Sequence, residues 1–340
     1  MRIAIASPTW ERVPPPAYGG IEAVVSLVAD GLVRRGHEVT LYATGDSITT
    51  ARLCSVLDQS LRTAGVDQPL PYQLAHVASV LADADRYDLI HNHCGELLMA
   101  FAHLKSTPML TTIHGPMVPD SRIVWDHYDG YFNTISHASK NGFPDRGYLG
   151  VVYNGIDVES FPFTREKGDY LLFLGRVSIE KGTHVAIEAA RRLGQRLIIA
   201  GKVDRVDRSY FEAEVAPLLD DPNVCYVGEA DAVRKRELFA NARCLLHPVM
   251  WPEPFGLVMP EAMACGTPVV AFGRGSIPEI IVHGQTGFVV DSVEGMIDAI
   301  RQLDQIDPAR CRSWVAERFS AEKMVTGYEC LYEEIDRQTR

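Results

Sequence analysis

Residues 170–200 read YLLFLGRVSIEKGTHVAIEAARRLGQRLIIA. The apolar run Tyr170–Leu174 predicts a buried strand, and a glycine-bounded loop follows at 175–182. Residues 183–193 are expected to form a helix, and Leu197–Ala200 is a second short apolar run. Strand, loop, helix and strand in this order make a βαβ unit, which indicates a parallel sheet with a right-handed crossover.

The first part of the chain follows the same order with a different sequence. Arg2–Ala6 predicts a strand, a proline-rich loop follows, and apolar residues from Ile21 to Leu32 have helical spacing. Gly36 ends that helix and Glu38–Ala43 predicts the next strand. We therefore predict an α/β protein with two Rossmann-like parallel-sheet domains and a ligand in the cleft between them.

Further strands are expected at 88–90, 109–113, 131–135 and 151–153. Ligands of open α/β sheets bind beyond the carboxyl ends of the strands. Four polar residues lie at such ends: His91, His93, His114 and Ser136. The turn residues at 154–157 mark the junction, so residues 1–155 are expected as one domain and 156–320 as the other. A tail helix is expected at 321–340.

Composition excludes several classes of protein. The 340 residues carry a net charge of −11, and no broad basic field favours nucleic acid. The basic run at 233–237 is interpreted as a solvated helix face. Seven scattered cysteines without a CxxC pair favour buried free thiols in a reducing compartment. No signal peptide or membrane span is expected, which predicts a cytoplasmic protein; weak peripheral association with a membrane stays open.

The loop at 175–182 holds two cations above the predicted sheet, Arg176 and Lys181. Arginine can bind two phosphate oxygens at once and lysine adds a mobile charge, so the loop is a candidate phosphate clamp. The alternative is ordinary surface charge on a loop.

Residues 251–270 read WPEPFGLVMPEAMACGTPVV. A helix is expected to start at 255–257, and its free amides suit a pyrophosphate. Glu253 and Glu261 flank that start, and carboxylates accept hydrogen bonds from sugar hydroxyls. A nucleoside diphosphate sugar would satisfy the cations and the carboxylates together. The alternative for Glu261 is favourable charge near a helix N-terminus.

These motifs occur together with GSIPEII, GQTGFVV and the N-terminal PPPAYGGIEAVV. In this order over nearly the whole chain, the set resembles the retaining glycosyltransferases of the GT-B fold, and within them family four (glycosyl transferases group 1). The resemblance implies two Rossmann-like domains facing a central cleft, with an acceptor-side domain first and a donor domain second. In such enzymes the C-terminal helix often packs back onto the first domain, so the resemblance implies the same for the tail helix here.

The resemblance further implies roles for single residues. Glu253 would contact the transferred sugar and Glu261 the ribose, while Arg176 and Lys181 would bind the diphosphate. His114 would lie near the donor sugar, with a strand-end core histidine as the alternative. Gly19 and Gly20 match the loop of the first domain that meets phosphates or acceptor. Further substrate contacts are expected at the predicted helix start, from Phe255, Gly256, Leu257 and Val258.

The implied reaction retains configuration without a protein nucleophile, and the leaving diphosphate accepts the proton of the acceptor. No cofactor is expected. No metal is expected either: the histidines of His91-Asn-His93 are interpreted as pointing to alternate sides of a strand end, and Asp83-Ala-Asp85 as lying far from the second-domain loops.

Two departures from the family pattern leave the donor open between UDP- and GDP-sugars. Gly201 is followed by Lys202-Val203-Asp204, and the segment 247–252 reads HPVMWP. The acceptor, whether a sugar, a lipid-linked or a small-molecule hydroxyl, and the oligomeric state are not indicated. Two other functions remain: an isomerase or phosphorylase on the same fold, and a non-catalytic sugar-nucleotide-binding subunit.

Overall fold

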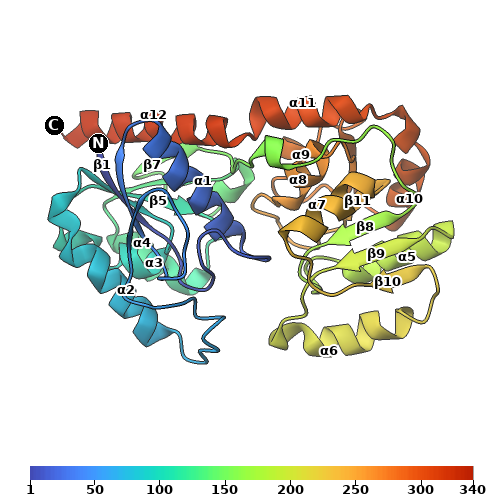
Figure 1. Ribbon diagram of the computed structural model, residues 1–340, viewed down its shortest axis with the longest axis horizontal. Helices are drawn as coiled ribbons and strands as arrows, with labels where there is room; N and C mark the ends of the chain where they lie inside the picture. The colour runs from blue at the N-terminus through green and yellow to red at the C-terminus, as the bar shows by residue number, and fades with distance from the viewer. Residues whose placement is uncertain (340) are drawn as a thin grey trace. The chain divides into compact units, whose positions relative to one another are not determined.

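The computed structural model describes residues 1–339, and the chain forms two compact units (Figure 1). The first unit consists of Met1–Gly155 together with the C-terminal helix α12 (Ala321–Thr339). The second unit consists of Ile156–Ser320. Each unit is built on its own parallel sheet.

Within the described residues, the first unit contains a seven-stranded sheet in the order β3-β2-β1-β4-β5-β6-β7, and its neighbouring strands run parallel. The strands are β1 (Arg2–Ala6), β2 (Glu38–Tyr42), β3 (Arg52–Cys54), β4 (Leu89–Asn92), β5 (Met109–Ile113), β6 (Tyr131–Thr134) and β7 (Tyr148–Val151). The main helices of its N-terminal segment are α1 (Gly20–Arg34), α2 (Leu70–Ala82), α3 (Glu96–Met99) and α4 (Arg122–His127).

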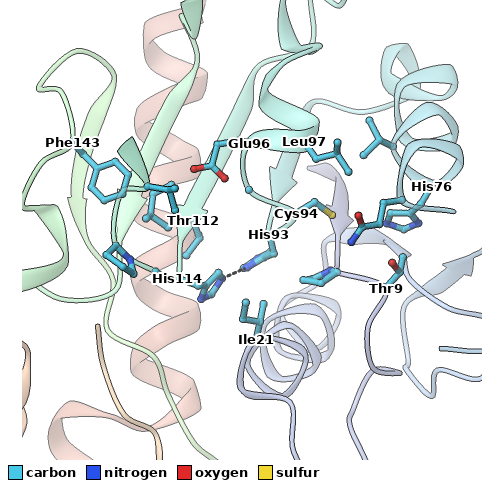
Figure 2. Close-up of a pocket in the computed structure, with 18 residues that line it drawn as sticks. Thr9, Ile21, His76, His93, Cys94, Glu96, Leu97, Thr112, His114 and Phe143 are labelled. Atoms are coloured by element: carbon cyan, nitrogen blue, oxygen red, sulfur yellow. Dashed lines mark hydrogen bonds between the residues drawn. The ribbon is translucent and has the colours of Figure 1, made fainter. Parts of the chain in front are cut away.

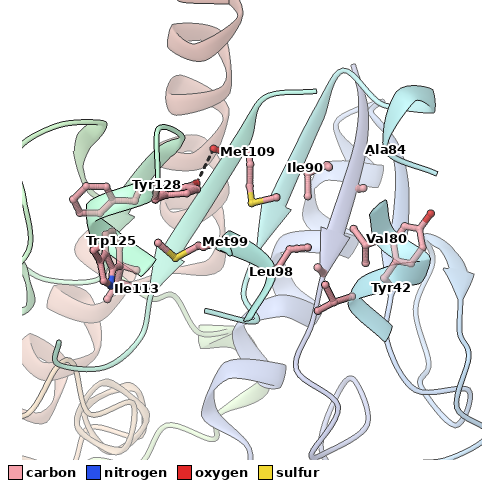
Figure 3. Packing of buried hydrophobic residues seen from close by; sticks show 14 of the residues in the cluster. Tyr42, Val80, Ala84, Ile90, Leu98, Met99, Met109, Ile113, Trp125 and Tyr128 are labelled. Atoms are coloured by element: carbon pink, nitrogen blue, oxygen red, sulfur yellow. Dashed lines mark hydrogen bonds between the residues drawn. The ribbon is translucent and has the colours of Figure 1, made fainter. Parts of the chain in front are cut away.

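Alternating side chains of this sheet face different helices, because successive residues of a strand point to opposite faces. Ile90 belongs to an apolar cluster with residues of α2, α3 and α4, including Val80, Leu98 and Trp125 (Figure 3). Its neighbour His91 points the other way, and its Nδ1 lies 2.7 Å from the hydroxyl of Tyr332 in α12. The sheet is therefore covered on one face by α2 to α4 and on the other by α12.

Helix α12 packs against α1 as well as the sheet. A Cβ atom on Gly31 of α1 would lie only 2.6 Å from Val325 Cγ2 of α12, so the two helices touch at this glycine. At the end of α1, Arg35 forms ion pairs with Glu322 and Glu329 of α12. The chain thus returns to the first unit after the second unit is complete.

The second unit, within the described residues, contains a six-stranded sheet in the order β10-β9-β8-β11-β12-β13. Helices α5 and α10 pack together, and α8 packs against α7 and α11. The strands are β8 (Leu171–Leu174), β9 (Leu197–Ala200), β10 (Val224–Tyr226), β11 (Cys244–His247), β12 (Val269–Phe272) and β13 (Gly287–Val290), and the helices are α5 (Thr183–Leu193), α6 (Arg208–Tyr210), α7 (Ala232–Asn241), α8 (Val258–Ala264), α9 (Ile277–Ile280), α10 (Val293–Arg301) and α11 (Pro308–Arg318).

The prediction of two parallel Rossmann-like sheets is confirmed. Some bounds were wrong. The strand expected at 151–153 is β7 at Tyr148–Val151, and β3 was not expected. The helix expected to start at 255–257 begins at Val258. The tail helix is observed to Thr339, and the Arg340 end of that prediction lies outside the described residues.

Two surface predictions were wrong in part. All seven cysteines are free, but only Cys244, Cys265 and Cys311 are buried, while Cys225 and Cys330 are exposed. The basic run at 233–237 is not a wholly solvated face, because Lys235 is half-buried and pairs with Glu261. In residues 1–339, no helix combines the length and the apolar character needed to cross a membrane.

Candidate active site

The loop between β8 and α5 in the second unit brings Arg176 and Lys181 to the carboxyl end of the sheet. Arg176 forms an ion pair with Glu180, and its Nε lies 3.6 Å from Asp207 Oδ2. Lys181 has a different partner: its Nζ donates a hydrogen bond of 2.5 Å to Glu253 Oε2. Both cations therefore have carboxylate partners in this structure.

Glu253 is buried, with 5% of its surface exposed. Besides Lys181, the indole Nε1 of Trp251 donates to its Oε2 at 2.9 Å. Burial acts to raise the pKa of Glu253, but the charge of Lys181 and these hydrogen bonds outweigh it and lower the pKa below its usual value. Glu253 is thus a carboxylate held ionised inside the protein.

His247, the last residue of β11, lies beside this ion pair and was not chosen as a candidate from the sequence. Its Nε2 is 3.9 Å from Glu253 Oε2 and, within the described residues, has no hydrogen-bond partner. Burial lowers the pKa of His247 to about 4, so the ring is neutral at pH 7. Its position at the carboxyl end of a strand is the same signal that selected His114.

Glu261 lies in the first turn of α8 and receives a hydrogen bond of 2.6 Å from Lys235 Nζ of α7. The second carboxylate is therefore paired as well. Lys235 could not be selected from sequence patterns, because it lies 26 residues before Glu261 on a different helix.

Gly256 makes the bend between the two glutamates possible. Its φ is +78°, which glycine adopts without strain. A Cβ atom there would lie 2.8 Å from Met259 Cε and 3.3 Å from both Glu253 Cγ and His247 Nε2. Of the neighbouring candidates, Phe255 is buried against Phe319, while Leu257 and Val258 are half-buried at the start of α8.

The first unit holds the other candidates. Gly19 caps α1 with φ +150°, and a Cβ atom on it would lie 2.6 Å from Pro15 Cβ, so the proline-rich loop packs closely on it; Gly20 is the first residue of α1. His114 follows β5, and its Nε2 shares a hydrogen bond of 2.8 Å with His93 Nδ1. Burial lowers the pKa of His114 to about 4.

The interpretation of His91 and His93 on alternate sides of a strand end was wrong. The two rings lie 4.1 Å apart, because residues two apart in a strand share a face. His91 is held by Tyr332 and Thr112. Asp83 accepts a hydrogen bond from Tyr42, and Asp85 pairs with Lys105. Among the described residues, no group of three or more His, Cys, Asp or Glu has an arrangement that could hold a metal.

Two family profiles match adjoining parts of the chain. The family described as Glycosyl transferases group 1 matches residues 157–314, and Glycosyltransferase Family 4 matches residues 18–160. The chain belongs to the group 1 glycosyltransferases. The first profile includes Arg176, Lys181, Glu253 and Glu261, and the second includes Gly19, Gly20 and His114.

Curated relatives of this glycosyltransferase match most of its length. An uncharacterized glycosyltransferase of Methanocaldococcus jannaschii is 28% identical over 87% of this chain and 88% of the relative. A glycogen synthase of Mycobacterium tuberculosis is 27% identical over 91% of this chain and 87% of the relative. The N-acetyl-alpha-D-glucosaminyl L-malate synthase of Bacillus anthracis is 24% identical and covers 96% of both.

Solved structures show the same fold. AviGT4, a glycosyltransferase involved in avilamycin A biosynthesis, has a TM-score of 0.78 and 25% identity, with 99% of this chain and 98% of the other covered. The Anabaena protein HepE in complex with UDP-glucose has a TM-score of 0.75 at 20% identity and covers 98% of this chain. These likenesses, with the two parallel sheets, establish the GT-B fold.

Proposed function

We propose that the protein is a retaining glycosyltransferase that moves a hexose from a UDP- or GDP-sugar to a hydroxyl acceptor without a metal ion. Arg176, Lys181 and the backbone amides around Gly256 bind the diphosphate. Glu253 accepts hydrogen bonds from the hexose, and Glu261 accepts them from the ribose. His114, with Gly19 and Gly20, contributes from the first unit.

The observation that supports this most directly is the buried pair of Lys181 and Glu253. A donor would exchange the partners of both groups: Lys181 would move to a phosphate oxygen, and Glu253 would accept sugar hydroxyls. Arg176 could exchange Glu180 for phosphate in the same way. Glu253, the buried charge among these groups, keeps hydrogen-bond partners in both states, which avoids the cost of an unpaired buried ion.

The reaction then needs no protein nucleophile. The bond from the anomeric carbon to the phosphate oxygen breaks, and the bond from that carbon to the acceptor oxygen forms on the same face. The proton of the acceptor hydroxyl passes to the leaving phosphate. Arg176 and Lys181 stabilise the charge that develops on that phosphate. The neutral ring of His247, beside Glu253, offers one further hydrogen bond to the hexose.

UDP-glucose is the first donor to test, because the similar Anabaena structure contains it. The acceptor is less defined. The relatives include a glycogen synthase, named for a neutral polymer, and an N-acetyl-alpha-D-glucosaminyl L-malate synthase, whose name contains an anion.

The test combines purified protein with panels of UDP- and GDP-sugars and hydroxyl acceptors. We expect acceptor-dependent release of nucleoside diphosphate and a product with the donor's anomeric configuration by NMR, both unchanged by EDTA. Inverted product or loss of turnover in EDTA would contradict the proposed mechanism. An epimerised sugar nucleotide, or a sugar phosphate formed only with added phosphate, would support the isomerase or phosphorylase reading instead.

A further inference from the structure

A pocket of about 280 Å³ lies in the first unit, at the carboxyl ends of β4 and β5 (Figure 2). Thr9, from the loop after β1, and His76, from α2, line it together. His93 and His114 line it from beyond the two strands, and Glu96 lines it from the start of α3. All these residues belong to the first unit.

Three residues that line this pocket carry buried polar atoms without hydrogen-bond partners. Neither ring nitrogen of His76 has a partner at hydrogen-bond geometry, although the Ser7 backbone lies close enough to favour its protonated form slightly. The hydroxyl of Thr9 and Nε2 of His93 are also without partners among the described residues. These three residues are only 2–3% exposed. Buried polar groups are normally hydrogen-bonded, so the arrangement points to a ligand that supplies the missing bonds.

The pocket carries no positive charge of its own. Among its lining residues in the described chain, none is lysine or arginine, and Glu96 is the sole carboxylate. Burial lowers the pKa of His76 and of His114 to about 4 and lowers that of His93 well below its usual value. The three imidazoles are therefore neutral at pH 7. His76 can offer a ligand one donor and one acceptor, whereas His93 offers only Nε2, because its Nδ1 bonds to His114.

Most of the remaining lining residues are apolar, although Gln73 and Thr112 add two polar side chains. Val77 and Leu97 line one part, and Ile113, Val118 and Phe143 line another. A ligand here needs hydroxyl groups, which both donate and accept, beside carbon surface. It also needs to lack negative charge, because Glu96 would repel an anion and no cation would pair with it.

We propose that this pocket binds the acceptor, and that the acceptor is an uncharged polyhydroxylated ring, a sugar or cyclitol without phosphate or carboxylate. The proposal rests on the proposed glycosyl transfer and narrows its substrate. The hydroxyls of the bound acceptor hydrogen-bond to His76, Thr9 and His93, and the carbon atoms of its ring pack on Val77 and Leu97.

The test uses matched probes: inositol against inositol 1-phosphate, and methyl glucoside against its 6-phosphate. Saturation-transfer NMR measures their binding to the full chain without donor. We expect each neutral probe to bind at least about 10-fold more tightly than its phosphorylated partner, a difference of about 1.4 kcal/mol. The variant His76→Phe should weaken neutral binding by a similar factor. Its fold is checked by thermal unfolding; the imidazole makes no hydrogen bond to lose.

A second variant tests the role of charge. Glu96→Gln, at a half-buried position, should improve binding of the phosphorylated probes. The difference in affinity between neutral and phosphorylated probes should therefore become smaller. Tighter binding of the phosphorylated probes to the unaltered protein would overturn the proposal. So would failure of both neutral probes to bind, or neutral binding that His76→Phe leaves unchanged. If the neutral probes bind in the pocket but no acceptor causes release of nucleoside diphosphate, the proposed function is contradicted. The preference of the pocket for neutral ligands would still be supported.

Discussion

Lys181 and Glu253 come from sites 72 residues apart and form an ion pair in which the carboxylate is almost completely enclosed. A surface ion pair contributes little to stability, but a buried one is costly to break because a charge is left without a partner. In the proposed function, this pair is the one that a diphosphate and a sugar would separate, each taking over one of the two charged groups.

Lys181→Ala removes the charge that would stabilise the leaving diphosphate. We expect turnover with donor and acceptor to fall by roughly two to three orders of magnitude, the range found when one such electrostatic group is deleted. Lys105→Ala is the matched control, since Lys105 pairs with the exposed Asp85 in the first unit and should not affect turnover. Circular dichroism checks that both variants fold. Unchanged turnover in Lys181→Ala would rule out this role.

Glu261→Gln should act on donor binding rather than on the chemical step. Contacts to the ribose are equally strong in the ground state and the transition state, so KM for the donor should rise about 10-fold while kcat changes little. Glu294→Gln, on the exposed partner of Arg192, is the control and should leave both constants unchanged. Steady-state kinetics with varied donor separates the two effects. A fall in kcat at constant KM would contradict the assignment to ribose.

Sequence patterns selected Arg176, Lys181, Glu253 and Glu261, because cations in a glycine-bounded loop and acids at a sharp turn are recognisable from the order of residues alone. They gave no sign that both acids are paired with lysines, because Lys181 and Lys235 lie far from those acids in the sequence. His247 could have been found by the strand-end rule. Its partnerless Nε2 could not, because that depends on which side chains surround it.

At the scale of elements, the strands that sequence placed correctly are buried along most of their length. β1 and β5 match their predicted bounds, and both are almost wholly apolar or enclosed. β7 was misplaced because it is an edge strand whose four residues are all half-buried, so hydrophobicity does not mark it. β3 was missed because it has three residues with no buried position.

The packing of α1 on α12 gives a prediction at this scale. Gly31→Ala would place a methyl group 2.6 Å from Val325 Cγ2, so the helices must separate or the valine must shift. We expect a loss of about 1–3 kcal/mol in the free energy of unfolding, as overpacked cores show. Urea denaturation measures it.

The control is the same change made in a Val325→Ala background. There the space for the new methyl group exists, and alanine favours a helix over glycine. Gly31→Ala should then be neutral or stabilising. If Gly31→Ala lowers the free energy of unfolding equally in the unaltered and Val325→Ala backgrounds, the contact with Val325 is not what limits the size of residue 31.

At the scale of the whole molecule, buried neutral histidines predict sensitivity to acid. His76, His91, His93, His114 and His247 all have pKa values lowered by burial. The unfolded chain binds protons at these groups below about pH 6.5, whereas the folded chain does not until about pH 4 or lower. Stability should therefore decline as the pH falls from 6.5 towards 4.

The variant His76→Phe isolates one of these groups. Because its pKa of about 4 lies below the usual value of 6.5, His76 contributes nearly one proton to the difference between the unfolded and folded states at pH 5. Its removal should flatten the dependence of unfolding free energy on pH by about 1 kcal/mol per pH unit between pH 6 and 4.5. Parallel curves for the variant and the unaltered protein would contradict a neutral, buried His76.

The central claim is that the loop at 175–182 and the backbone around Gly256 bind the diphosphate of a sugar nucleotide, while Glu253 and Glu261 hold hydroxyls. A crystal structure with an intact nucleoside diphosphate sugar tests it most directly. We predict phosphate oxygens within hydrogen-bond distance of Arg176, Lys181 and the amides near Gly256, with Lys181 no longer on Glu253. Phosphates bound away from both segments, with the ion pair of Lys181 and Glu253 intact, would contradict the account.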